Sequence, residues 1–178
     1  MTHIPQLALD EATPKAQELL GGVKQQLGIV PNIFKVMAHS PAVLDAYLSQ
    51  GSALAASSLS MKLREQIAVA IAGVNSCDYC ASAHTAIGKG AGLSAEELSD
   101  NLAGGSSDEK TQAALFFARA IVEGRGRVDE QALQNIRSAG FTEGEIVEII
   151  ALVGVNTFTN YLNHIAGTEI DFPVVQTA

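Results

Sequence analysis

The two cysteines of this chain lie three positions apart, and a histidine follows shortly after them. His84 is four residues after Cys80, and Glu65 is twelve residues before Cys77. Two thiols, an imidazole and a carboxylate therefore fall within twenty residues of sequence. Thiols this close can cycle between a dithiol and a disulfide, or can bind a metal ion. We take Glu65, Cys77, Cys80 and His84 as the candidate catalytic group.

A helix through the two cysteines would place them and His84 on one face, because residues three and four apart are neighbours on a helix. Free N–H groups and the macrodipole at a helix start favour an anion, which lowers the pKa of a thiol there. His84 can accept the thiol proton or, once protonated, stabilise the thiolate. The dipole alone makes Cys77, which is nearer to the helix start, the better thiolate.

Two helices joined by a sharp turn are expected to bring Glu65 to the thiols. Ser60 is typical of the cap of a helix over residues 61–75, and the interior of that helix, residues 67–72, is apolar on all sides, which predicts that the helix is buried. A second helix is expected to begin at Ser76 and to end at a cluster of glycines. A turn over residues 73–76 would return the carboxylate to the dithiol, where it could exchange a proton with a thiol.

The remaining sequence also predicts helices. Thr13-Pro14 and Ser40-Pro41 are typical of helix starts, and no strand-like alternation persists beyond a few residues. The sequence predicts one all-α domain over residues 1–178, a bundle of about eight helices. Capping boxes of the form Ser/Thr-x-x-Glu are expected at Ser94–Glu97, Ser106–Glu109 and Thr142–Glu145, the last opening a long helix that ends at Gly167.

One segment is echoed later in the chain. Residues 71–76 (Ile-Ala-Gly-Val-Asn-Ser) resemble residues 152–157 (Leu-Val-Gly-Val-Asn-Thr), which lie 81 positions later. This similarity indicates a duplicated helical unit, with a degenerate second copy over about residues 142–167. At the same offset, the two cysteines and the histidine correspond to Phe158, Tyr161 and Ile165.

Composition restricts the class of protein. Hydrophobic residues make up 47% of the chain and charged residues 17%, so some apolar surface is expected to be covered by other subunits. The net charge is −8 and there is no run of Lys or Arg, which argues against nucleic-acid binding. No apolar stretch suggests a membrane span, and no secretion signal is recognised, so we expect a cytoplasmic protein. A lone cysteine pair in that reducing compartment is typical of a reactive or metal-binding site.

The string Glu65-x11-Cys77-x2-Cys80-x3-His84 resembles the core motif of the alkyl hydroperoxidase D (AhpD) family, within the carboxymuconolactone decarboxylase superfamily. The resemblance extends over most of the chain, including residues 34–41 (Phe-Lys-Val-Met-Ala-His-Ser-Pro) and residues 156–161 (Asn-Thr-Phe-Thr-Asn-Tyr). It is strongest to the peroxidase-related subgroup of AhpD-like proteins.

This resemblance implies an all-helical homo-oligomer, a trimer or hexamer, that reduces hydroperoxides without a metal or flavin cofactor. It implies that Cys80 becomes the sulfenic acid, and that Cys77 donates a proton and then forms the redox-active disulfide. Glu65 and His84 would relay protons. The resemblance further implies reduction by a dihydrolipoyl protein or another dithiol, and electron transfer to a peroxiredoxin. We follow it in assigning attack to Cys80, because the adjacent histidine can outweigh one turn of helix dipole.

Four other interpretations are left open by the residues. The thiols can be a buried structural pair, since free cysteine packs as a small hydrophobic residue. Zinc can bind Cys77, Cys80 and His84, although a structural zinc site normally has four protein ligands. A decarboxylase acting on a carboxylated lactone would need no dithiol. A redox-sensing oligomer would use the disulfide only to change its assembly.

Overall fold

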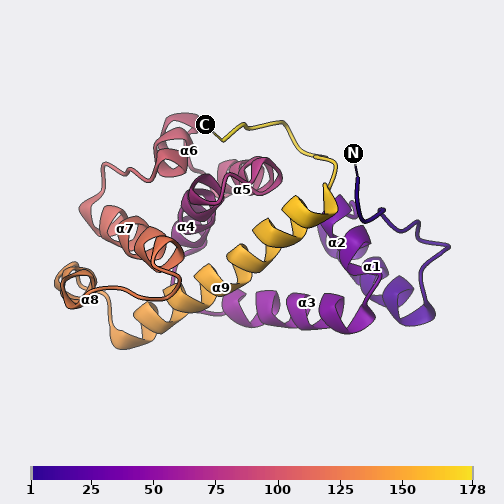
Figure 1. Cartoon of the computed structure of the whole chain (residues 1–178), viewed down its shortest axis with the longest axis horizontal. Helices are drawn as coiled ribbons and strands as arrows, with labels where there is room; N and C mark the ends of the chain where they lie inside the picture. Colours follow the sequence, from indigo (N-terminus) through magenta and orange to yellow (C-terminus); the bar gives the residue numbers. More distant parts are fainter. Residues whose placement is uncertain (1, 178) are drawn as a thin grey trace.

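The computed structural model describes residues 2–177, and every regular element within that range is an α-helix (Figure 1). The all-α prediction is confirmed. The described residues form nine helices where about eight were expected, and the shortest of the nine is α2, of six residues. The helices are α1 (Pro14–Leu27), α2 (Asn32–Met37), α3 (Pro41–Ala55), α4 (Met61–Val74), α5 (Asp78–Gly90), α6 (Ala95–Ala103), α7 (Glu109–Glu123), α8 (Glu130–Ser138) and α9 (Glu143–Ala166). Within the described range, no helix is long and apolar enough to cross a lipid bilayer.

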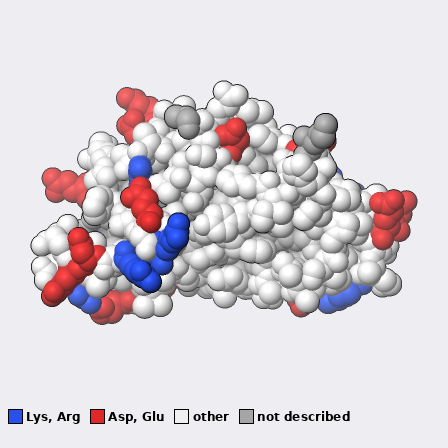
Figure 2. All heavy atoms as spheres, viewed as in Figure 1, with Lys and Arg blue, Asp and Glu red and all other residues white. Residues whose placement is uncertain are grey.

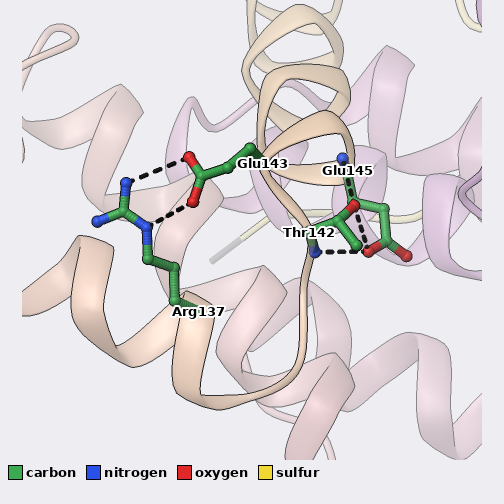
Figure 3. Close-up of polar contacts among 4 residues, drawn as sticks. All are labelled: Arg137, Thr142, Glu143 and Glu145. Carbon is green, nitrogen blue, oxygen red and sulfur yellow. Dashed lines mark hydrogen bonds and ion pairs between the residues drawn. The ribbon is translucent and has the colours of Figure 1, made fainter.

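The predicted helix starts are confirmed except at α5 and α7. Thr142 and Glu145 form the predicted capping box at the start of α9, beside an ion pair between Arg137 and Glu143 (Figure 3). The capping box predicted at Ser106 is wrong. Asp108 caps α7 instead, because its carboxylate accepts the N–H of Thr111 at 2.8 Å. An aspartate one position before the helix makes this bond directly and adds a favourable charge at the dipole's positive end.

Helix α4 is the centre of the molecule and packs against α5, α6, α7 and α9. Its residues 66–72 are all buried, as predicted from the absence of a polar face. At Gly73 a Cβ atom would lie 2.1 Å from the carbonyl oxygen of Leu102, so only glycine permits α6 to approach this closely. The buried helix α4 therefore provides a closely packed support for the site residues.

The turn between α4 and α5 sets the position of the first cysteine. Ser76 adopts a left-handed conformation with φ of 53°, and the N–H of Cys77 donates to the carbonyl of Ala72 at 2.9 Å. Because Ser76 is part of this turn, α5 begins at Asp78, two residues later than the predicted start at Ser76. Cys77 is therefore the N-cap of α5 and does not lie within the helix.

The echoed segment differs in local structure between its two copies. Residues 71–76 end α4 and reverse the chain, whereas residues 152–157 lie inside α9, which continues without a break. The duplication therefore stays a prediction.

The chain after α9 runs back along α5 (Figure 1). Asp171 accepts a hydrogen bond from the Tyr79 hydroxyl at 2.9 Å and another from the Asn32 backbone N–H at 2.8 Å. Further along, the Val175 N–H donates to Ser82 Oγ at 2.9 Å. The tail thereby joins α2 and α5 across one side of the site.

Candidate active site

The four predicted site residues meet where the start of α5 lies against α4 and α9. Helix α4 carries Glu65, α5 carries Cys80 and His84, and the turn between them supplies Cys77. His84 Nδ1 lies 2.8 Å from Glu65 Oε2, and the two cysteine Sγ atoms are 2.7 Å apart. The fold thus unites residues that are up to nineteen positions apart in sequence.

The dithiol is buried and held by the helix start. Cys77 is 1% exposed and Cys80 is 3% exposed, and both are free thiols. Cys77 Sγ accepts the backbone N–H of Cys80 at 3.3 Å, in the manner of an N-cap side chain. This bond fixes the sulfur of Cys77 against that of Cys80, close enough for a disulfide to form with little movement of the backbone.

The surroundings place the negative charge on Cys80. Hydrogen-bond donation from Cys77 is the largest cause that lowers the pKa of Cys80 to about 6; burial opposes it, and the charge of His84 adds to it. The same hydrogen bond, together with burial, raises the pKa of Cys77 far above its usual range. The thiolate therefore lies on the cysteine that the resemblance assigns to attack. The helix dipole, which alone favours Cys77, is outweighed by contacts between side chains.

His84 is the basic side chain that lines the cavity beside Cys80. Burial alone would lower its pKa, but the charge and hydrogen bond of Glu65 and the charge of Cys80 outweigh burial, so the pKa of His84 is raised. The side chains of His84 and Glu65 are only 21% and 14% exposed, so solvent screens this pair weakly. The imidazole beside the sulfur is therefore easier to protonate than a free histidine.

An apolar cavity of about 270 Å³ opens onto Cys80 and His84. Its wall includes no atom of Cys77, so Cys80 is the sulfur that a molecule in the cavity would meet. Thr159 and Asn163 of α9 are the other polar groups of the wall apart from the Tyr47 and Tyr79 rings. The apolar lining comprises Leu27, Ile29, Pro31, Ile33, Phe34, Ala83, Ile87 and Phe172.

A family model described as the carboxymuconolactone decarboxylase family matches residues 41–124, which run from α3 to α7 and include all four site residues. The chain contains a carboxymuconolactone decarboxylase family domain. This confirms the superfamily recognised from the cysteine motif. A search of curated proteins finds no match to the chain.

The chain is similar in structure to AhpD-like proteins. An uncharacterized peroxidase-related protein from Ralstonia eutropha JMP134, with an alkylhydroperoxidase AhpD core, is 26% identical, with a TM-score of 0.83, over 96% of this chain and 92% of that one. A peroxidase-related protein from Silicibacter sp. TM1040 is 25% identical, with a TM-score of 0.81, over 94% and 92% of the two chains. The debrominase Bmp8, solved with 2,3,4-tribromopyrrole, shares the fold at 22% identity and a TM-score of 0.81, over 96% and 92%.

Two asparagines that the sequence analysis did not single out complete the surroundings of Cys80. They lie on α9, outside the residues matched to the carboxymuconolactone decarboxylase family. Asn163 Nδ2 donates to Cys80 Sγ at 3.2 Å, and the buried amide of Asn160, whose Nδ2 has no hydrogen-bond partner among the described residues, also lowers the pKa of Cys80. Asn75, in the turn before Cys77, orients Asn160 by donating to its Oδ1 at 2.8 Å. The sequence did contain a signal for these residues, because asparagines recur at helical spacing within the predominantly apolar helix α9.

Tyr47 closes the cavity beside the Glu65–His84 pair. Burial is the main reason that the pKa of Tyr47 is raised to about 12, and the charges of Cys80 and Glu65 add to it. Its hydroxyl is therefore neutral at physiological pH. Within residues 2–177, no three His, Cys, Asp or Glu side chains are arranged to hold a metal ion.

Proposed function

We propose that the protein is a thiol-dependent peroxidase, a disulfide oxidoreductase that cycles Cys77 and Cys80 between dithiol and disulfide. The observation that carries this proposal is the Cys80 sulfur, with its lowered pKa, at the wall of an apolar cavity and in contact with Cys77 on its other side. A thiolate is the nucleophilic form of cysteine, and a second thiol in contact can resolve the oxidised product.

In the first step, the Cys80 thiolate attacks the outer oxygen of a hydroperoxide ROOH. The O–O bond breaks, the sulfur becomes a sulfenic acid, and RO⁻ takes a proton to leave as the alcohol ROH. In the second step, the Cys77 sulfur attacks the sulfenic sulfur, a disulfide forms, and hydroxide takes a proton to leave as water. An external dithiol then returns two electrons and two protons to the pair.

Glu65 and His84 would supply and recover these protons. The imidazolium of His84 lines the cavity, where it can protonate RO⁻, and its Nδ1 is bonded to Glu65. Loss of the proton from His84 leaves a base that can accept the proton of Cys77 before it resolves the sulfenic acid.

The apolar wall favours an organic hydroperoxide over hydrogen peroxide, because burying an alkyl or aryl group adds binding energy. The electron donor, a dihydrolipoyl protein or other dithiol, and a peroxiredoxin as electron acceptor are proposed from the family resemblance. The same resemblance supports a cytoplasmic trimer or hexamer with no cofactor besides the disulfide.

Reductive debromination is the second candidate, because the cavity has aromatic walls and a solved debrominase shares the fold. The same dithiol could reduce an aryl bromide to the arene and bromide while it becomes a disulfide. A decarboxylase acting on a carboxylated lactone is less well supported, since that reaction has no use for Cys77 and Cys80.

Steady-state turnover separates these candidates. We expect dihydrolipoamide to be consumed with cumene hydroperoxide, and consumption to be lost in both Cys77→Ser and Cys80→Ser variants. A decarboxylase would retain its turnover in the double variant. Release of bromide from tribromopyrrole without consumption of any hydroperoxide would replace the proposal with debromination. A wild-type protein that turns over none of the hydroperoxides tested would remove the peroxidase.

A further inference from the structure

The last turns of α9 hold the turn between α4 and α5 at two points, just before Cys77. Asn75 Nδ2 donates to Asn160 Oδ1 at 2.8 Å, and Nε2 of His164 lies 3.1 Å from the carbonyl oxygen of Ser76. Asn160 and His164 are four residues apart, so they lie on one face of α9. We call these two residues the α9 clamp, because they bind two successive residues of the turn.

His164 is the hydrogen-bond donor in its contact with the turn. A carbonyl oxygen can only accept, so Nε2 carries a hydrogen, as it does in one neutral tautomer and in the imidazolium. Among the described residues His164 takes part in no ion pair, and Figure 2 shows a broad area without charged side chains over α9 and α3. The bond to Ser76 is therefore the contact that orients the ring.

Ser76 is the residue of the turn that needs support from outside it. Its φ of 53° is left-handed, a conformation that is costly for a residue with a side chain and persists where the surroundings enforce it. The Ser76 N–H donates locally to the carbonyl of Gly73 at 3.1 Å. His164 binds from another helix, 88 positions away in sequence, and fixes the peptide group that joins Ser76 to Cys77.

The orientation of that peptide group affects the two cysteines differently. Cys77 precedes the first residue of α5, so its backbone conformation depends on the turn, and its Sγ lies 2.7 Å from that of Cys80. Cys80 lies within α5 and has its own donor in Asn163. Loss of the bond from His164 should therefore displace Cys77 and leave Cys80 in place.

We propose that His164 is a positioning residue for the resolving cysteine, holding the Cys77 sulfur where it can attack Cys80. This role rests on the proposed function. The cavity wall, as the described residues form it, includes no atom of His164, so the first step at Cys80 does not involve this residue. His164 acts on the second step, in which the Cys77 sulfur attacks the sulfenic sulfur, a disulfide forms, and hydroxide takes a proton to leave as water.

Single-turnover oxidation by cumene hydroperoxide, without a reductant, separates the two steps. Acid quenching and mass spectrometry follow the dithiol, the sulfenic acid and the disulfide, which differ in mass. In His164→Leu we expect an unchanged rate of sulfenic acid formation and disulfide formation slowed by about 5- to 10-fold, the effect of one hydrogen bond. Excess hydroperoxide should then convert more of the sulfenic acid to sulfinic acid, releasing a second molecule of alcohol.

Two further variants distinguish positioning from a general effect on the fold. His164→Gln keeps an N–H donor at a similar reach, so it should resolve at nearly the wild-type rate. His39→Leu is the matched control, because His39 is also an exposed histidine whose Nε2 lies 2.8 Å from a backbone carbonyl, that of Pro5. We expect His39→Leu to leave both steps unchanged.

Equilibration with reduced and oxidised dithiothreitol tests the same role without a hydroperoxide. The bond from His164 keeps the two thiols in contact, so the equilibrium constant for closing the disulfide should fall about 5- to 10-fold in His164→Leu and stay unchanged in His39→Leu. A wild-type resolution rate and equilibrium constant in His164→Leu, or equal slowing of both oxidation steps, would overturn the role of His164. A wild type that consumes no hydroperoxide would remove the proposed function, while the equilibrium would still decide whether His164 positions Cys77.

Discussion

At the scale of residues, the site is governed by which sulfur carries the charge. Cys77 and Cys80 differ by three positions in sequence but have opposite surroundings, because one donates the hydrogen bond that the other accepts. The pKa values of the two thiols are therefore pushed apart. Separated pKa values allow one sulfur to attack while the other keeps the proton that it later gives up.

Alkylation of Cys80 should follow this lowered pKa. The thiolate is the reactive form, so the rate should be constant well above pH 6 and fall as the pH drops through about 6. Cys77→Ala removes the largest cause of the shift and should move the midpoint upward toward the ordinary thiol value. Peptide mass spectrometry after pulses of iodoacetamide between about pH 4 and pH 9 measures both midpoints. A wild-type midpoint near that of a free thiol would contradict the assignment.

Asn163 should contribute to the same thiolate. Asn163→Leu removes a donor to a charged sulfur, so we expect the rate of Cys80 oxidation at neutral pH to fall roughly 10-fold or more. Asn156→Leu is the matched control, since Asn156 is buried on the same helix but donates to the carbonyl of Leu152. Stopped-flow oxidation by hydroperoxide measures the two rates. Equal losses in both variants would indicate a general effect on α9 instead of a bond to Cys80.

At the scale of elements, the site depends on how closely helices pack around α4. Most of the cap residues and the buried segment of α4 were predictable, because both depend on local sequence; the cap of α7 was the exception, since Asp108 takes the place of Ser106. The left-handed turn at Ser76 was not, since its conformation is unusual for a residue other than glycine. The position of α9 against Cys80 was also missed, because its contact with Asn163 spans 83 positions.

The close approach of α4 and α6 should make Gly73 irreplaceable. Gly73→Ala forces a Cβ against the carbonyl of Leu102, so we expect the free energy of unfolding to fall by about 1–3 kcal/mol. Gly51→Ala, in α3 with nothing within 4 Å, should instead raise it by about 0.5–1 kcal/mol. Urea denaturation followed by circular dichroism measures both. Equal effects at the two positions would mean that α6 can move away without cost.

At the scale of the whole molecule, the sequence predicted the all-α class, the superfamily and the four residues that the fold brings together. The all-α class was predicted from composition and helix signals, and the superfamily and the four residues were predicted from the cysteine motif. The cavity could not be predicted from the sequence, since its wall is formed by the end of α1, the segment before α2, α2, α3, α5, α9 and the C-terminal tail. Apolar composition did indicate covered surface, but only the structure locates it on α3 and α9.

The central claim is that Cys80 attacks the hydroperoxide and Cys77 resolves the product. Trapping with dimedone, a sulfenic-acid reagent, in the two single variants tests it most directly. After one equivalent of cumene hydroperoxide, the account predicts a dimedone adduct on Cys80 in Cys77→Ser and none on Cys77 in Cys80→Ser. An adduct on Cys77 in Cys80→Ser, with none on Cys80 in Cys77→Ser, would contradict it.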